Sequence, residues 1–140
     1  MEKLVLIGKS VIAGKVSGDA LASDQPLSFW GGYDWKSGEI TDRRHPLSGM
    51  NAKNKILVVP FTRGSSTTTA VLLEAIREGT APAAIITTAT DFFFALASVV
   101  ASELYEKSFP LIALSETDFY LLQTGDHLEI EESGHVIVRQ

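Results

Sequence analysis

The sequence contains no cysteine, and this absence removes several kinds of chemistry at once. Without thiols the chain forms no disulfide and supplies no thiolate ligand to a metal ion or an iron–sulfur cluster. Long hydrophobic runs are missing too, since no segment approaches the ~18 apolar residues that a membrane-spanning helix needs. The apolar run Leu4–Ile7 is also too short for a secretory signal. We therefore expect a cytoplasmic protein without membrane contact.

Positive charge is the next scarce feature. Lysine and arginine together number 12 against 17 aspartate and glutamate residues, so the net charge is -5. Because no basic cluster stands out, the chain is a poor candidate for binding nucleic acid. Its 140 residues are 45% hydrophobic and 21% charged, which is typical of a globular protein and of one domain over residues 1–140.

The middle of the chain alternates between two hydrophobic patterns. Short apolar runs at residues 55–60, 83–87 and 110–114 predict buried strands. Between them, one predicted helix ends at Gly79 and another runs from a cap at Asp91 to about residue 107. We expect the second helix to bury one face, made of Phe94, Ala97, Val100, Ala101 and Leu104. Strands that alternate with helices predict parallel pairing.

The flanks of the chain are β-rich. Residues 4–7 and 11–12 are short β-prone runs, and residues 127–130 and 136–138 predict a hairpin with its turn near Ser133 and Gly134. A long glycine-rich segment, residues 31–49, reads as an ordered loop in which Asp34 and Asp42 form turns. The sequence therefore predicts an α/β fold with parallel central strands and β-rich flanks.

The turn from Val59 to Ser66 is the strongest local signal of a binding site. A predicted strand ends, Gly64 permits a tight bend, and serine and threonine fill positions 65–69 as a helix begins. Helix-start N–H groups, hydroxyls and the Arg63 guanidinium together can bind a carboxylate or phosphate. Simple capping by Ser65 or Ser66 explains these residues about as well, so both interpretations stay open.

Histidine supplies the other candidates for chemistry. His127 and His135 fall in the predicted hairpin, where we expect them to face solvent. His45 lies in the long loop beside Arg44 and has a better claim to a site, although bracing the loop by hydrogen bonds is its commoner role. The run Phe92–Phe94 is most simply core packing, and it would mark an interface if it were exposed.

Taken together, these segments resemble the small subunit, or swivel domain, of the aconitase X group of hydro-lyases. The resemblance covers nearly the whole chain. Its most specific motifs are Gly31-Gly32-x-Asp34, Gly38-x-Ile40-x-Asp42-x-x-His45-Pro46-Leu47-x-Gly49, Arg63-Gly64-Ser65-Ser66, Val71-Leu72-Leu73-Glu74-Ala75, Gly79-Thr80-Ala81-Pro82-Ala83 and Gly125-Asp126.

The resemblance implies a swivelling β/β/α domain that dehydrates a small hydroxy acid together with a large catalytic subunit. It implies that the iron centre, mononuclear or a cluster, is bound by the large subunit and that this chain binds no cofactor or metal itself. Ser65 of the Arg63-Gly64-Ser65 motif is then the catalytic base. Arg63, Gly64, Ser66 and His45 are expected to bind the substrate.

Two substrates are known for such proteins, cis-3-hydroxy-L-proline and 5-phosphomevalonate. Ser66 stands where archaeal members often carry cysteine, which favours the hydroxyproline branch. The segment Ala89–Phe93 keeps Asp91 but lacks an acidic residue that members often have before it. A stand-alone module that binds a small anion without catalysis is the alternative, and a homo-oligomeric scaffold using Phe92–Phe94 is a weaker third possibility.

Overall fold

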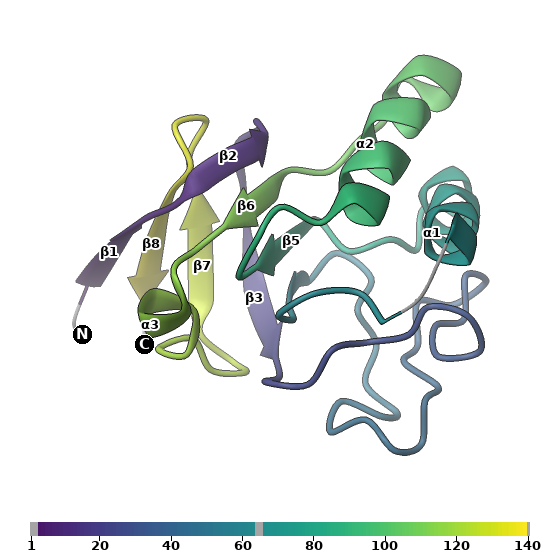
Figure 1. The fold of residues 1–140 in the computed structure, drawn as a ribbon, viewed down its shortest axis with the longest axis horizontal. Helices are drawn as coiled ribbons and strands as arrows, with labels where there is room; N and C mark the ends of the chain where they lie inside the picture. The colour runs from purple at the N-terminus through teal and green to yellow at the C-terminus, as the bar shows by residue number, and fades with distance from the viewer. Residues whose placement is uncertain (1–2, 64–65, 140) are drawn as a thin grey trace.

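The computed structural model describes residues 3–63 and 66–139, which form one mixed sheet and three helices (Figure 1). No helix in this part of the chain is long and apolar enough to cross a bilayer. The elements in chain order are β1 (Lys3–Ile7), β2 (Lys9–Ile12), β3 (Val16–Ala22), β4 (Ile56–Val58), α1 (Ser66–Glu78), β5 (Ala84–Thr87), α2 (Phe92–Tyr105), β6 (Leu111–Ala113), α3 (Glu116–Phe119), β7 (His127–Ile130) and β8 (His135–Arg139).

The sheet has the strand order β1-β8-β7-β3-β4-β5-β6-β2. Strands β3 to β6 are parallel to one another, and the remaining pairs are antiparallel. The predicted α/β class, with parallel central strands and β-rich flanks, is therefore confirmed. The three predicted central strands and the terminal hairpin are present as well.

The sheet curls until its two ends meet at Gly8. Strands β1 and β2 occupy opposite ends of the strand order, yet Gly8 alone separates them in the chain. The Gly8 N–H donates to the carbonyl of Gly134 at 3.2 Å. A Cβ atom at Gly8 would lie 2.6 Å from Cγ2 of Ile112, so only glycine fits this crossing without displacing the neighbouring strand.

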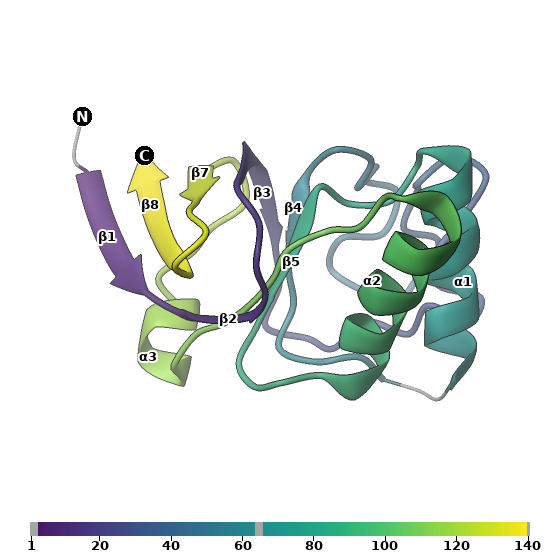
Figure 2. The same ribbon diagram turned by 90° about the horizontal axis from the view of Figure 1, so that it is seen from above.

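The alternation of side chains along the central strands creates two hydrophobic cores. In β4, Ile56 and Val58 face the core inside the curl, whereas Leu57 faces the helices. Figure 2 shows α1 and α2 side by side on one side of the sheet and α3 on the other. Each central strand is thus covered on both faces, as parallel strands normally are.

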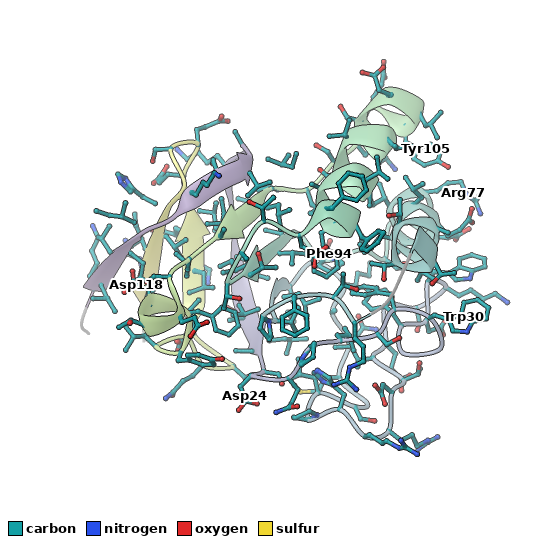
Figure 3. The ribbon with its side chains drawn as sticks, in the orientation of Figure 1. Asp24, Trp30, Arg77, Phe94, Tyr105 and Asp118 are labelled. Atoms are coloured by element: carbon teal, nitrogen blue, oxygen red, sulfur yellow. The ribbon has the colours of Figure 1, made fainter. Side chains whose placement is uncertain are left out.

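Helix α2 confirms its predicted cap and corrects its predicted face. The Asp91 carboxylate accepts hydrogen bonds from the N–H groups of Phe93 and Phe94 at 3.1 Å. Phe94 lies in the interior of the molecule, as Figure 3 shows. Leu104, in contrast, is 63% exposed, and Ser98 is fully buried instead. Val100 is half-buried, so the predicted stripe is wrong at Leu104.

Ser98 is buried because it has partners there. Its hydroxyl donates to the carbonyl of Phe109 at 2.8 Å and accepts the Phe109 N–H at 3.3 Å.

The sequence pattern also missed two elements, β3 and α3. In β3, Gly18 and Asp19 interrupt the apolar pattern, and pairing with β4 and β7 overrides their weak strand preference.

Candidate functional site

The loop after β4, residues 59–63, is tied to its surroundings at nearly every residue. The Val59 N–H donates to the Ile86 carbonyl, and the Pro60 carbonyl accepts from both the N–H and the hydroxyl of Thr88 at 3.1 Å. The Arg63 N–H donates to the Leu27 carbonyl at 3.0 Å. A loop with this many backbone partners holds its side chains in place before any ligand arrives.

Thr62 is the inward-facing member of this loop. Its N–H donates to the Asp91 carboxylate at 2.9 Å, and its hydroxyl lies 2.9 Å from the hydroxyl of Thr68 in the first turns of α1. Residues on either side of it, Phe61 and Arg63, are exposed. The extended backbone therefore directs Thr62 into the protein and presents its two neighbours to solvent.

The hydroxyl-rich start of α1 is partly structural. Thr68 is buried against Thr62, and Thr69 donates from its hydroxyl to the Phe93 carbonyl at 3.1 Å. These two hydroxyls brace α1 against its neighbours and do not face solvent. The hydroxyl run on which the anion-site interpretation relied is therefore only partly directed towards a ligand.

Arg63 lines a small hollow that the sequence alone could not delimit. The lining residues are Gln25, Pro26, Asp42, Arg44, His45 and Arg63. Its volume of about 60 Å³ is several times the roughly 10–15 Å³ of cavity that one water molecule needs, so a group of carboxylate size fits. Arg44 is a second arginine at this hollow, and sequence reasoning did not select it as a site residue.

These two arginines differ from others in the chain in their partners. Arg77 and Arg139 each pair with a nearby glutamate, at 2.7 and 3.3 Å. Arg44 and Arg63, like Arg43, form no ion pair within residues 3–63 and 66–139, but of these three only Arg44 and Arg63 line the hollow. Because two arginines without a carboxylate partner line one hollow, this corner is suited to an anion from outside.

His45 has both ring nitrogens engaged by backbone groups. Nδ1 accepts the Leu47 N–H at 3.1 Å, so Nε2 carries the proton and donates to the Gln25 carbonyl at 3.1 Å. The buried ring thus joins the long loop to the segment that follows β3. These contacts correspond to the bracing role, and the expected substrate contact of His45 stays a prediction.

The long loop is held by its aspartates, as expected. Asp34 accepts from the Lys36 N–H at 2.9 Å and from the Ser37 hydroxyl at 3.0 Å, and these hydrogen bonds hold the pKa of the Asp34 carboxyl below its usual value. Asp42 accepts the Arg44 N–H at 3.1 Å. The Asp42 turn thereby positions Arg44 and His45 at the hollow.

The Arg63-Gly64-Ser65-Ser66 motif is described only in part. Gly64 and Ser65 lie outside the described residues, and Ser66 enters the description only as the first residue of α1. The flanking geometry is clear, however. Arg63 is the last residue of the hydrogen-bonded loop that follows the carboxyl end of β4. Helix α1 begins three residues later.

Comparison with known proteins identifies this arrangement. A family model described as the aconitase X swivel domain matches residues 5–138. This chain belongs to that family.

Named relatives agree with this membership. Cis-3-hydroxy-L-proline dehydratase of Pseudomonas aeruginosa is 44% identical over 80% of this chain and 19% of its own length. The phosphomevalonate dehydratase small subunit of Thermococcus sibiricus is 32% identical over 96% of this chain and 98% of its own. A crystal structure titled as Thermococcus kodakaraensis aconitase X (holo-form) matches with TM-score 0.87 and 28% identity, covering 98% of this chain and 99% of that one. This chain spans only about a fifth of the length of the Pseudomonas dehydratase.

In this swivel domain, Asp91 has a larger role than the sequence alone predicted. Its cap on α2 could be predicted from local sequence, but its bond to Thr62 joins segments 29 residues apart. The buried carboxylate therefore couples the start of α2 to the loop that carries Arg63. Only the pairing of β4 with β5 brings these two loops together.

The described residues of this swivel domain do not form a metal site. No group of three histidine, aspartate or glutamate side chains within residues 3–63 and 66–139 could hold a metal ion, and the sequence has no cysteine. The iron centre that the resemblance implies therefore finds no ligand set in this part of the chain, and we derive no step through it.

Proposed function

We propose that this chain is the small subunit of an aconitase X-type hydro-lyase that dehydrates a small hydroxy acid. The observation that carries the proposal is the Arg63-Gly64-Ser65-Ser66 motif, which follows the hydrogen-bonded loop after β4. The chain also belongs to the aconitase X swivel domain family. Its relatives named for hydroxyproline and phosphomevalonate dehydration support this reaction class.

Ser65 is the proposed base. In the elimination, the deprotonated serine oxygen takes a proton from a carbon of the substrate, a carbon–carbon double bond forms, and the hydroxide on the adjacent carbon leaves as water with a proton from solvent. Loss of the serine proton to solvent then restores the base. A serine oxygen acts as a base only where its negative charge is stabilised. The N–H groups at the start of α1 and the Arg63 guanidinium are suited to that task.

Arg63 and Arg44 are proposed to bind the acid group of the substrate. Two arginines and one acidic residue, Asp42, line a hollow of carboxylate size. Gly64 and Ser66 are proposed to add backbone and hydroxyl contacts, and His45 to shape the wall. The hollow accommodates only part of a substrate, so the remaining contacts and the iron centre are assigned to a large catalytic subunit.

The isolated chain is therefore expected to be inactive and to work in a heterodimer. Cis-3-hydroxy-L-proline is the favoured substrate, because the relative at 44% identity carries that name and Ser66 fits that branch. Phosphomevalonate is the second candidate, supported by relatives that match this chain over nearly their whole length.

The Ser65→Ala substitution tests the proposal in the complex with the cognate large subunit. We expect a fall in kcat of about 10²–10⁴-fold with the complex intact, because only the proton transfer is lost. Ser108→Ala, an exposed residue between α2 and β6, is the matched control. Elimination of water is measured for both substrates in oxygen-free buffer, and near-normal turnover by the Ser65 variant would contradict the assignment of the base.

A stand-alone anion-binding module is the second candidate, and the unpaired Arg44 and Arg63 within the described residues favour it. Titration calorimetry of the isolated chain with phosphate and with hydroxyproline distinguishes the two. Tight binding by the chain alone, without any complex with a large subunit, would favour the module over the enzyme.

A further inference from the structure

Two phenylalanine rings are exposed beside the proposed site. Phe61 is 50% exposed and Phe92 is 67% exposed. The hydrogen bond from the Thr62 N–H to the Asp91 carboxylate joins their chain neighbours, so the two rings come from adjacent loops at the carboxyl ends of β4 and β5. Of the predicted Phe92–Phe94 patch, only Phe92 is exposed, because Phe94 is buried and Phe93 is half-buried.

Both rings are carried by rigid backbone. Phe92 is the first residue of α2, directly after the Asp91 cap. Phe61 lies between Pro60, whose carbonyl accepts two hydrogen bonds, and Thr62, which is bonded through both its N–H and its hydroxyl. Because the backbone that carries these rings is already fixed, binding through them costs little backbone entropy, which favours tight association.

Other exposed apolar side chains lie elsewhere on the fold. Leu104 is near the far end of α2, Ile7 is at the end of β1, and Trp30 lies in the segment between β3 and β4. Phe61 is two residues from Arg63, which lines the hollow, and the bond from Thr62 to Asp91 brings Phe92 to the same pair of loops. Phenylalanine and arginine together are the composition of an interface centre, whereas scattered leucines are ordinary surface.

The comparisons indicate which partner fits this surface. The Pseudomonas dehydratase devotes only 19% of its length to the part that matches this chain, and the Thermococcus relative is named a small subunit. A partner that completes the hollow must cover the edge on which Arg63 lies, and it would meet Phe61 and Phe92 there. The two unpaired guanidiniums add attraction for a partner or its bound substrate that carries negative charge.

We propose that Phe61 and Phe92 are the anchors by which this edge docks onto the large catalytic subunit, an inference that rests on the proposed function. The rings fill apolar pockets of the partner, and docking encloses Arg63 and the start of α1. They take no part in the proton transfer. Their loss therefore weakens association and leaves the chemistry of the assembled complex unchanged.

The test compares the Phe61→Ala/Phe92→Ala double variant with Leu104→Ala, which removes a similarly exposed apolar side chain from the far end of α2. The dissociation constant of the full chain for its cognate large subunit is measured by calorimetry. We expect a rise of about 30- to 1000-fold for the double variant and less than about threefold for Leu104→Ala. At saturating large subunit, turnover should stay within about threefold of the wild type.

A second measurement needs no substitution. Amides of residues 61–63 and 91–94 should gain hydrogen-exchange protection when the wild-type complex forms, while those near Leu104 should not. Wild-type affinity of the double variant, or no added protection at these residues, would overturn the docking proposal even if the complex is active.

The outcomes separate docking from function. A complex that depends on both rings but dehydrates neither substrate would uphold the docking surface and overturn the proposed activity. An active complex whose affinity does not change when both rings are removed would uphold the proposed activity and overturn the docking surface. Failure of the wild-type chain to bind any cognate large subunit would overturn both.

Discussion

The hydroxyl of Tyr33 is buried and donates a hydrogen bond to the Thr80 carbonyl at 2.8 Å. The ring stacks on Phe29 with centroids 5.0 Å apart, so this residue ties the long loop to the segment after α1. Burial raises the pKa of Tyr33 well above its ordinary value. The folded state therefore favours the neutral phenol, and ionisation of this residue opposes folding.

We expect this environment to make stability depend on alkaline pH. A group whose folded-state pKa is raised contributes stability that is fully present below its unfolded pKa, about 10 for tyrosine, and is lost as the pH rises above that value. The Tyr33→Phe variant should lose about 1 kcal/mol at neutral pH through the missing hydrogen bond. Above pH 10 the free energy of unfolding of the wild type should fall more steeply than that of Tyr33→Phe. The difference should reach up to about 1.4 kcal/mol per pH unit.

Urea unfolding between pH 8 and 11 measures both effects. Tyr120→Phe, a residue more than half exposed, is the control and should behave as the wild type does at every pH. Identical pH dependence of the wild type and Tyr33→Phe would show that ionisation of Tyr33 has no effect on folding.

At the scale of elements, the cap of α2 also organises the loop that carries Arg63. One oxygen of Asp91 accepts the N–H groups of Phe93 and Phe94, and the other accepts the Thr62 N–H. Helix capping is local and follows from sequence. The bond to Thr62 depends on how two parallel strands place their following loops, which no short pattern encodes.

Removal of this carboxylate should be costly for its size. We expect Asp91→Ala to lower the free energy of unfolding by about 2–4 kcal/mol, because it removes a cap and leaves the buried Thr62 N–H unpaired. Ser115→Ala removes a single exposed cap bond of 3.3 Å from α3 and should cost about 0.5–1 kcal/mol. Chemical denaturation of both variants compares them, and equal losses would mean that the Thr62 bond contributes nothing.

The predicted helices and strands were confirmed where they depended on residues close together in the sequence. The apolar runs of β4, β5 and β6 and the glycine that ends α1, with φ 82°, are visible in sequence. The prediction failed at Leu104 and Ser98, because the buried face of α2 depends on where α1 and Phe109 lie. Likewise, the inward direction of Thr68 depends on Thr62, which lies outside the helix.

At the scale of the whole molecule, one crossing links the two ends of the sheet. Gly8 sits where β1 passes into β2, and a Cβ there would also come within 2.8 Å of the Gly134 carbonyl oxygen. Strand β2 completes the parallel half through β6, while β1 completes the antiparallel half through β8. Displacing this crossing would disturb both halves together.

Gly8→Ala should therefore lower the free energy of unfolding by about 1–3 kcal/mol through overpacking. Gly18→Ala in β3 is the matched control, since its Cβ would meet no atom closer than 3.3 Å, and it should cost less than about 1 kcal/mol. Thermal and urea unfolding measure the two changes. A Gly8 variant as stable as the control would mean that the strands yield at this point without cost.

The sequence by itself determined the α/β class, the parallel middle, the helix ends and the Arg63–Ser66 motif, because each depends on residues close together in the chain. The absence of cysteine likewise settled which metal ligands the chain lacks. Only the tertiary structure decided which groups meet. Arg63, Arg44 and His45 share a hollow because the long loop folds back on residues 25–27, and Asp91 reaches Thr62 because β4 pairs with β5. Such contacts depend on long-range strand pairing and burial, which local patterns do not specify.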